Sequence, residues 1–195
     1  YLSYSINPLL FGNEISDNQA SSEKGGGVYL QNSNNATIEN NVVLRNRIVN
    51  GDGAGLFIEY SDGNELINNL IAENEIDGVG QGSGVYGFNS DSLLVHNTVV
   101  RNNGGTGEGL LAAFDTTWTV TNTILVSHSV GVQAKFNTVV NMDGTLWGDG
   151  AWSNSADAKA DASSIVNVGP VSIDGLPAFL DPSAGDYHIY PTSAA

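Results

Sequence analysis

The sequence predicts an all-β solenoid in which short strands stack coil upon coil. Two motifs recur in step along the first two thirds of the chain, and neither follows the 3.6-residue period of an amphipathic helix. Glycine accounts for 24 of the 195 residues, which favours frequent turns. Self-similarity at a fixed period is the signature of a stacked repeat architecture.

The first motif pairs aliphatic residues with asparagine, as in IENNVVLRN, where Ile38, Asn41, Val43 and Asn46 carry the pattern. It returns in LFGNEISDN, LINNLIAEN and LVHNTVVRN, and in a weaker copy, TVTNTILVS. The anchor positions are Asn13, Asn41, Asn69, Asn97 and Asn122, so the spacing is 28 residues three times and then 25.

The second motif is a glycine followed by a short apolar strand. It reads GGGVYL, GAGLFI, GSGVYG, GEGLLA and a faded SVGVQA, with final glycines at Gly27, Gly55, Gly84, Gly109 and Gly131. Because the two motifs keep one period, each is expected to mark a fixed place in every coil.

Each repeat contains three strand candidates, which span residues 27–31, 36–40 and 42–44 in the second repeat. Such strands can pair with their counterparts one coil away at about 4.8 Å. Two interior columns are then expected: Ile38, Leu66 and Leu94, and Val43, Ile71 and Val99. Asparagine tolerates the left-handed conformation of a tight bend, and its amide both donates and accepts, so the anchor residues are predicted to form a buried ladder.

This pattern, over about residues 9–140, resembles the right-handed parallel β-helix family, the pectate-lyase-like superfamily. The resemblance implies a right-handed parallel β-helix. Residues 1–140 are expected to form coils of about 22–29 residues, and residues 141–195 an irregular C-terminal cap of the same domain, because an open solenoid end needs covering.

The segment PAFLDPSAGDYHIYPTSAA is similar to the closing segment of certain bacterial surface β-helix proteins, which implies surface attachment and a larger parent protein. We expect Tyr187, Ile189 and Tyr190 to hold this tail on the cap. His188 beside Asp186 could be half of a catalytic or metal pair, but a polar neighbour of the cap is favoured because a catalytic zinc usually takes three ligands.

The charge balance limits the partners. Lys and Arg number 6 against 21 Asp and Glu, for a net charge of −15, which argues against nucleic acid and anionic membranes. The balance suits calcium or a neutral polysaccharide, and it could also serve only solubility. Cysteine is absent, and no apolar stretch is long enough to span a bilayer. The chain begins at Tyr1 without a visible signal peptide, which indicates processing or excision.

Strand alternation directs one aromatic column outward from the glycine-motif strand. Its members are Tyr29, Phe57 and Tyr86, with Phe88 and Glu59 in the next outward column. We predict that these five residues bind carbohydrate, because sugar rings stack on aromatic faces. The same aromatics could instead pack under loops or reflect β propensity.

Acidic residues follow the same strands once per coil. Asp62 and Asp91 with Glu59 could bind calcium, since carboxylates one coil apart repel one another without a cation between them. The alternative is that Asp62 and Asp91 are ordinary turn residues capping their loops.

Three functions remain open at the level of sequence. The first is an extracellular β-helix, secreted or at the cell surface, that binds a polysaccharide or cell-surface glycan without cleaving it, and we predict this one. The second is a polysaccharide lyase acting on acidic glycans, although the motifs of the galacturonan hydrolases and alginate epimerases of the superfamily are missing. The third is a purely structural surface stalk.

Overall fold

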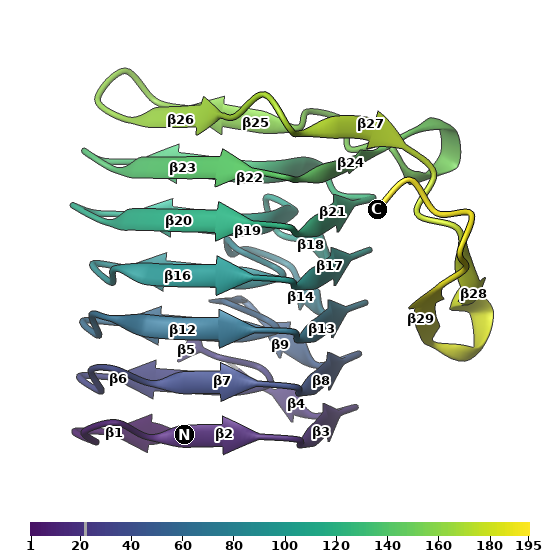
Figure 1. Ribbon diagram of the computed structural model, residues 1–195. Coiled ribbons are helices and arrows are strands. Elements are labelled where there is room, and N and C mark those ends of the chain that lie inside the picture. The colour runs from purple at the N-terminus through teal and green to yellow at the C-terminus, as the bar shows by residue number, and fades with distance from the viewer. Residues whose placement is uncertain (22) are drawn as a thin grey trace.

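Each circuit of the chain returns to the same place one coil further along a single axis (Figure 1). The computed structural model describes residues 1–21 and 23–195. In these residues the chain forms strands joined by short turns, with two 3-10 segments, η1 (Gly150–Trp152) and η2 (Pro182–Ala184). The predicted all-β, right-handed parallel β-helix is confirmed.

Three parallel sheets of seven strands form the sides of the solenoid. Sheet A contains β1 (Leu2–Ser3), β6 (Val28–Gln31), β11 (Leu56–Glu59), β15 (Val85–Phe88), β19 (Glu108–Ala113), β22 (Val130–Lys135) and β25 (Ala158–Ala160). Sheet B contains β2 (Leu9–Phe11), β7 (Thr37–Glu39), β12 (Asn64–Ile67), β16 (Ser92–Val95), β20 (Thr117–Thr121), β23 (Val139–Asp143) and β26 (Ile165–Val168). Sheet C contains β3 (Glu14–Ser16), β8 (Val42–Leu44), β13 (Leu70–Ala72), β17 (Thr98–Val100), β21 (Ile124–Val126), β24 (Leu146–Gly148) and β27 (Ile173–Gly175).

A fourth strand completes the earlier coils. Sheet D contains β4 (Gln19–Ala20), β9 (Arg47–Val49), β14 (Glu75–Asp77) and β18 (Asn103–Gly104), and β5 (Glu23–Lys24) pairs with β10 (Gly51–Asp52). The sequence analysis expected three strands per coil. In the sequence, the fourth strand is marked by one aliphatic residue per coil. In the structure these residues, Ile48 in β9 and Ile76 in β14, are fully buried.

The interior columns are as predicted. Ile38 pairs in register with Leu66, and Leu66 with Leu94, while Val43 pairs with Ile71, and Ile71 with Val99; all six are buried. Burying one methylene contributes about 0.8 kcal/mol, so these columns supply much of the stabilisation that each short strand lacks alone.

The asparagine ladder is confirmed for its first four members, of which Asn41, Asn69 and Asn97 are buried and Asn13, in the first coil, is exposed. The Asn69 side-chain oxygen accepts from the backbone N–H and the amide of Asn41, at 3.0 Å each, and Asn97 serves Asn69 in the same way. Asn122 is a correction, because register places Thr123, not Asn122, opposite Asn97. The left-handed residue is also not the ladder asparagine but the one before it, such as Asn40 or Asn68.

A second ladder precedes sheet D, one strand after the first. Asn46 donates to Asn74 and Asn74 to Asn102 through the same pair of bonds, with both oxygens at 2.8–3.0 Å from their amide donors. His128 takes the next place in this ladder and Asn154 the one after it. Buried amides are therefore satisfied along both ladders.

Stacking continues past residue 140, where the sequence repeat fades. Strands β25, β26 and β27 pair in parallel with β22, β23 and β24, so the segment expected to be only a cap contributes a further coil. Backbone hydrogen bonds between coils do not require the sequence motifs, which is why stacking outlasts them.

The C-terminal hairpin lies on the flank of the solenoid and not over its end (Figure 1). Its strands, β28 (Phe179–Asp181) and β29 (Asp186–Ile189), are antiparallel. Phe179 and Tyr187 are buried against outward side chains of sheet C, and the Tyr187 hydroxyl donates to Glu73. The expected tail anchors are thus partly corrected, because Ile189 and Tyr190 are about half exposed. None of the helical segments in residues 1–21 and 23–195 is long and apolar enough to cross a membrane.

Candidate functional site

The predicted aromatic column has the predicted register but is not an open platform. Phe57 pairs with Tyr29 on one side and Tyr86 on the other, yet Phe57 is 1% exposed and Tyr86 4%. The glycine turn before each strand lies against the base of the aromatic side chain, and Lys24 Nζ lies over the Phe57 ring at 5.1 Å from its centroid. Gly53 has φ +67°, and a Cβ there would lie 2.7 Å from Cβ of Phe57.

The aromatic rings also cover one another. Phe57 meets Tyr29 and Tyr86 edge to face, with centroids 5.5 Å and 4.8 Å apart. Phe88 is half-buried, and its ring centroid lies 4.4 Å from that of Phe114, with 35° between the two ring planes. These two rings belong to a second row of aromatic side chains, near the turns between sheets A and B. Sugar rings would need these aromatic faces, and neighbouring rings already occupy them.

Glu59 is a buried acceptor within this column. Its carboxylate accepts from Lys24 Nζ at 2.5 Å, from the Tyr29 hydroxyl at 2.5 Å and from Gln31 at 3.2 Å. Burial would raise the pKa of Glu59, but the bonds from Lys24 and Tyr29 outweigh burial and hold that pKa below its ordinary value. Burial, with the bond to Glu59, raises the pKa of Tyr29. Carbohydrate binding by this column stays a prediction.

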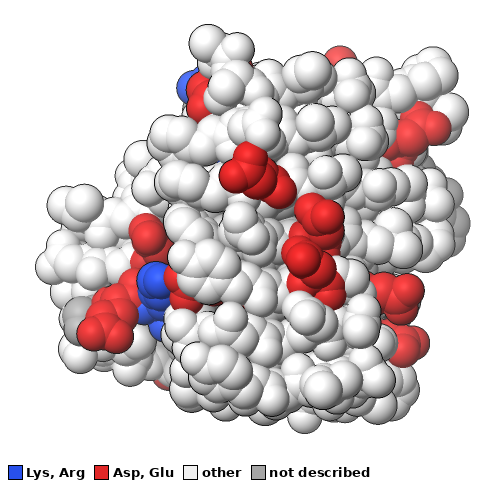
Figure 2. All heavy atoms as spheres, turned by 90° about the vertical axis from the view of Figure 1, so that its left-hand side faces the viewer, with Lys and Arg blue, Asp and Glu red and all other residues white. Residues whose placement is uncertain are grey.

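Most cations of the chain are held by other side chains. Lys135 bonds Gln81 at 2.8 Å and lies 3.4 Å from buried Glu108, and Arg45 pairs with Asp17. Arg47 pairs with Asp77, and Arg101 lies over the ring of Trp152. Figure 2 looks onto the turns between sheets A and B and shows acidic side chains across this face, with few basic ones among them.

The one-per-coil acidic residues form a turn ladder. Asn34 accepts from the backbone N–H of Asp62, Asp62 from that of Asp91, and Asp91 from that of Thr117. These bonds fit the alternative that Asp62 and Asp91 are turn residues. Each carboxylate, however, caps a backbone N–H of the next coil and not one of its own loop. Within the described part of the chain, no three acidic or histidine side chains are grouped as a metal site, and Glu59 bonds a different set of partners. Calcium binding stays a prediction.

A groove lies on another side of the solenoid, between the turns joining sheets B and C and the β28–β29 hairpin. We call it the flank groove. It consists of two adjoining hollows of about 590 Å³ and 470 Å³, whose walls share Asn68, His96, Thr98, Tyr187 and His188. Concave sites with an apolar floor and a few convergent polar groups are the usual ligand sites of proteins.

One wall of the flank groove is a row of turn residues, one from each of four successive coils. Its members, which we call the turn row, are Asn40, Asn68, His96 and Asn122. Each has φ between 48° and 56°, and each precedes the ladder residue of its coil. The Asn68 amide donates to the side-chain oxygen of Asn40 at 2.6 Å, so these two members are in contact. The row ends at Gly144 in the following coil.

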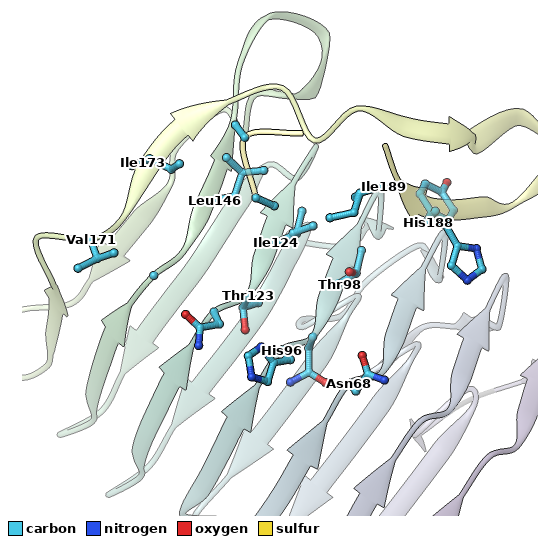
Figure 3. Close-up of a pocket in the computed structure, with 16 residues that line it drawn as sticks. Asn68, His96, Thr98, Thr123, Ile124, Leu146, Val171, Ile173, His188 and Ile189 are labelled. Carbon is cyan, nitrogen blue, oxygen red and sulfur yellow. The ribbon is translucent and has the colours of Figure 1, made fainter. Parts of the chain in front are cut away.

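The other wall comes from the hairpin. Figure 3 shows Asn68 and His96 on the stacked turns and His188 with Ile189 on the opposite side, with Thr98 and Ile124 between them. Asp186 Oδ1 lies 2.6 Å from Nδ1 of His188. Bonds from the backbone and ring of His188 hold the pKa of Asp186 below its ordinary value.

The chemistry of the flank groove is that of hydrogen bonding. Amide and imidazole groups supply both donors and acceptors, and aliphatic side chains of sheet C, such as Leu70 and Ile124, form the floor. Sequence reasoning missed this site. The turn row was visible as the residue before each anchor asparagine, but its opposite wall depends on where the tail folds, and no repeat encodes that.

The comparisons with known proteins agree with the fold. The family described as "right handed beta helix region" matches residues 1–145. The crystal structure of the periplasmic alginate epimerase AlgG is similar, with a TM-score of 0.52 at 18% identity over 90% of this chain and 42% of that chain. A mutant of the same epimerase gives a TM-score of 0.51 at 16% identity, over 88% and 44%. This chain therefore spans less than half the length of those structures. No curated protein matches the sequence.

Proposed function

The chain belongs to the right-handed β-helix family, and from that premise we propose that it binds a carbohydrate chain in the flank groove without cleaving it. The observation that carries the proposal is the turn row, which faces His188 across a groove with an apolar floor. Amides pair well with sugar hydroxyls, because each amide can donate and accept at once. Aliphatic side chains suit the C–H faces of a sugar ring.

Two features support binding over cleavage. A lyase needs a base placed beside the acidic carbon and a cation to neutralise the uronate. Lys24, Lys135, Arg45 and Arg47 are each paired with a carboxylate, and none of these four side chains lines the flank groove. Among the Asp, Glu, Lys and Arg side chains of the described residues, only that of Asp186 lines the groove, and it is bonded to His188.

The charge of the whole chain supports a neutral ligand. A net charge of −15 repels polyanions over a range of several ångströms at physiological ionic strength. We place the protein outside the cytoplasm, in the periplasm, secreted or at the cell surface, where polysaccharides occur. The structurally similar AlgG is described as a periplasmic alginate epimerase, which supports this placement.

A glycan array followed by calorimetry on the best-binding glycan tests the proposal. The variants are Asn68→Gly and His96→Gly, since glycine keeps the left-handed backbone and removes only the side chain. We expect affinity to fall roughly tenfold when both are changed, as two hydrogen bonds are lost. Asn89→Gly is the matched control, because Asn89 has φ 47° in the turn between sheets A and B.

Binding that survives the double change would place the ligand elsewhere. A chain that binds no glycan would support the structural stalk. Unsaturated product absorbing in the ultraviolet would instead show a lyase and contradict a role limited to binding.

A further inference from the structure

We propose that the flank groove takes an extended, linear neutral glycan lying along the solenoid axis, with one sugar residue for each coil of the turn row. The inference rests on the proposed carbohydrate binding and names the class of chain that the groove accepts.

The first ground is the spacing of the polar groups. The backbone N–H of Asn40 bonds the carbonyl of Ile67, that of Asn68 bonds Val95, and that of His96 bonds Thr121. Each turn is therefore fixed to the next coil by the same hydrogen bond. The side chains of the turn row then repeat at the distance between parallel strands, about 4.8 Å.

The second ground is the direction of the opposite wall, because the hairpin runs along the coils. Gly185 lies beside Leu44 and Arg45 in the second coil, and Tyr187 reaches Glu73 in the third. Ile189 lines the groove with Ile124 and Leu146, which belong to later coils. Both walls thus follow the axis, and so must the ligand.

The third ground is the apolar floor. Val42, Leu70, Ile124 and Leu146 occupy the same outward place in successive strands of sheet C, with Thr98 between them. All five line the groove. The floor therefore offers an aliphatic side chain in four of these five coils and a threonine in the other, and the turn row adds one amide or imidazole to each coil from Val42 to Ile124.

A ligand can contact every member of the turn row only if its own repeat length matches the spacing between coils. In an extended β-1,4-linked chain, each pyranose residue advances by nearly the distance between two coils, so successive residues can meet successive polar groups. An α-1,4-linked chain curls into a helix and leaves the row after a short contact. The charge of −15 further disfavours acidic chains.

Calorimetry at neutral pH with two series of oligosaccharides tests the inference. The probes are cello-oligosaccharides and malto-oligosaccharides from the disaccharide to the hexasaccharide. We expect affinity for the β-1,4 series to rise roughly two- to tenfold with each residue up to the tetrasaccharide, because each residue adds about one hydrogen bond, and then to level off. Asn122→Gly removes one end of the row and should move the plateau to the trisaccharide, while Asn89→Gly should leave the plateau in place.

The outcomes separate the two proposals. Binding without dependence on length, or the same dependence in the α-1,4 series, would overturn the axial, one-residue-per-coil arrangement and leave carbohydrate binding standing. If neither these series nor any glycan of the array binds, both proposals fail.

Discussion

Each buried polar side chain in the two ladders needs a hydrogen-bond partner in the coil before it and in the coil after it. Asparagine fits because its amide donates to one neighbour and accepts from the other, and the run Asn46, Asn74 and Asn102 repeats this bond. His128 replaces the amide in the next coil and is 5% exposed. Asn102 donates towards Nε2 of His128, and Nδ1 of His128 faces the oxygen of Asn154. Only the neutral ring, protonated on Nδ1, satisfies both partners.

Because the ladder needs a neutral His128 ring, we predict that the free energy of unfolding falls in mild acid. Burial lowers the pKa of His128 from 6.5 to about 4. Between pH 6.5 and about 4 the unfolded chain binds more protons at His128 than the folded chain does. The contribution of His128 to the free energy of unfolding is therefore fully present above pH 6.5 and is lost as the pH falls towards 4. The total loss is about 3 kcal/mol. Chemical denaturation at a series of pH values measures it.

His128→Asn should restore the ladder amide and remove this part of the pH dependence. A variant with the same slope as the parent between pH 6.5 and 4 would show that other groups cause the loss.

At the scale of elements, the turn ladder between sheets A and B tests the calcium prediction. Asp62 and Asp91 stand one coil apart, and each uses one oxygen for a backbone N–H. A cation between their remaining oxygens would relieve repulsion, so calcium should raise the melting temperature, and Asp62→Asn with Asp91→Asn should abolish that rise. A melting curve that is the same with calcium and with chelator would count against the site.

The hairpin is the second element with a measurable role. Tyr187 packs with Phe179, at 5.1 Å between ring centroids, against the flank of sheet C. Tyr187→Ala should weaken docking by about 3 kcal/mol, as for other buried aromatic residues, and speed proteolysis of the tail while the coils stay intact. Tyr187→Phe keeps the ring and loses only the bond to Glu73, so its cleavage rate should change little. Equal cleavage of Tyr187→Ala and the parent would contradict docking through this ring.

Sequence periodicity predicts what repeats and nothing that occurs once. The columns of Leu66 and Ile71 and the ladder through Asn69 follow directly from the 28-residue period. The ladder place is Thr123 and not Asn122 because the turn between sheets A and B gains one residue in this coil, so the 25-residue offset of sheet A becomes 26 in sheets B and C. The aromatic column has the predicted register, but alternation alone could not show that the neighbouring rings and Lys24 cover Phe57. The flank groove needs the hairpin, whose position is set by apolar contacts distant in sequence.

At the scale of the molecule, the solenoid presents two faces that differ in how they are covered. The outer face of sheet A is closed by rings that pack edge to face, by glycine turns at the base of these rings and by the bond of Lys24 to Glu59. The flank of sheet C is apolar on both sides, and the hairpin covers part of it and leaves a groove beside the turn row. A stack of equivalent coils thus turns one local turn geometry into a periodic row of polar side chains beside the groove.

Mapping a bound oligosaccharide by amide chemical shifts tests this account most directly. With cellohexaose added to the isotope-labelled chain, shifts are predicted at Asn40, Asn68, His96 and Asn122 and across the groove at His188. Little change is predicted at Tyr29, Phe57 and Tyr86, which lie on sheet A. Shifts confined to the sheet A column would contradict the flank groove and restore the aromatic face as the binding site, and a spectrum unchanged by every glycan would contradict carbohydrate binding itself.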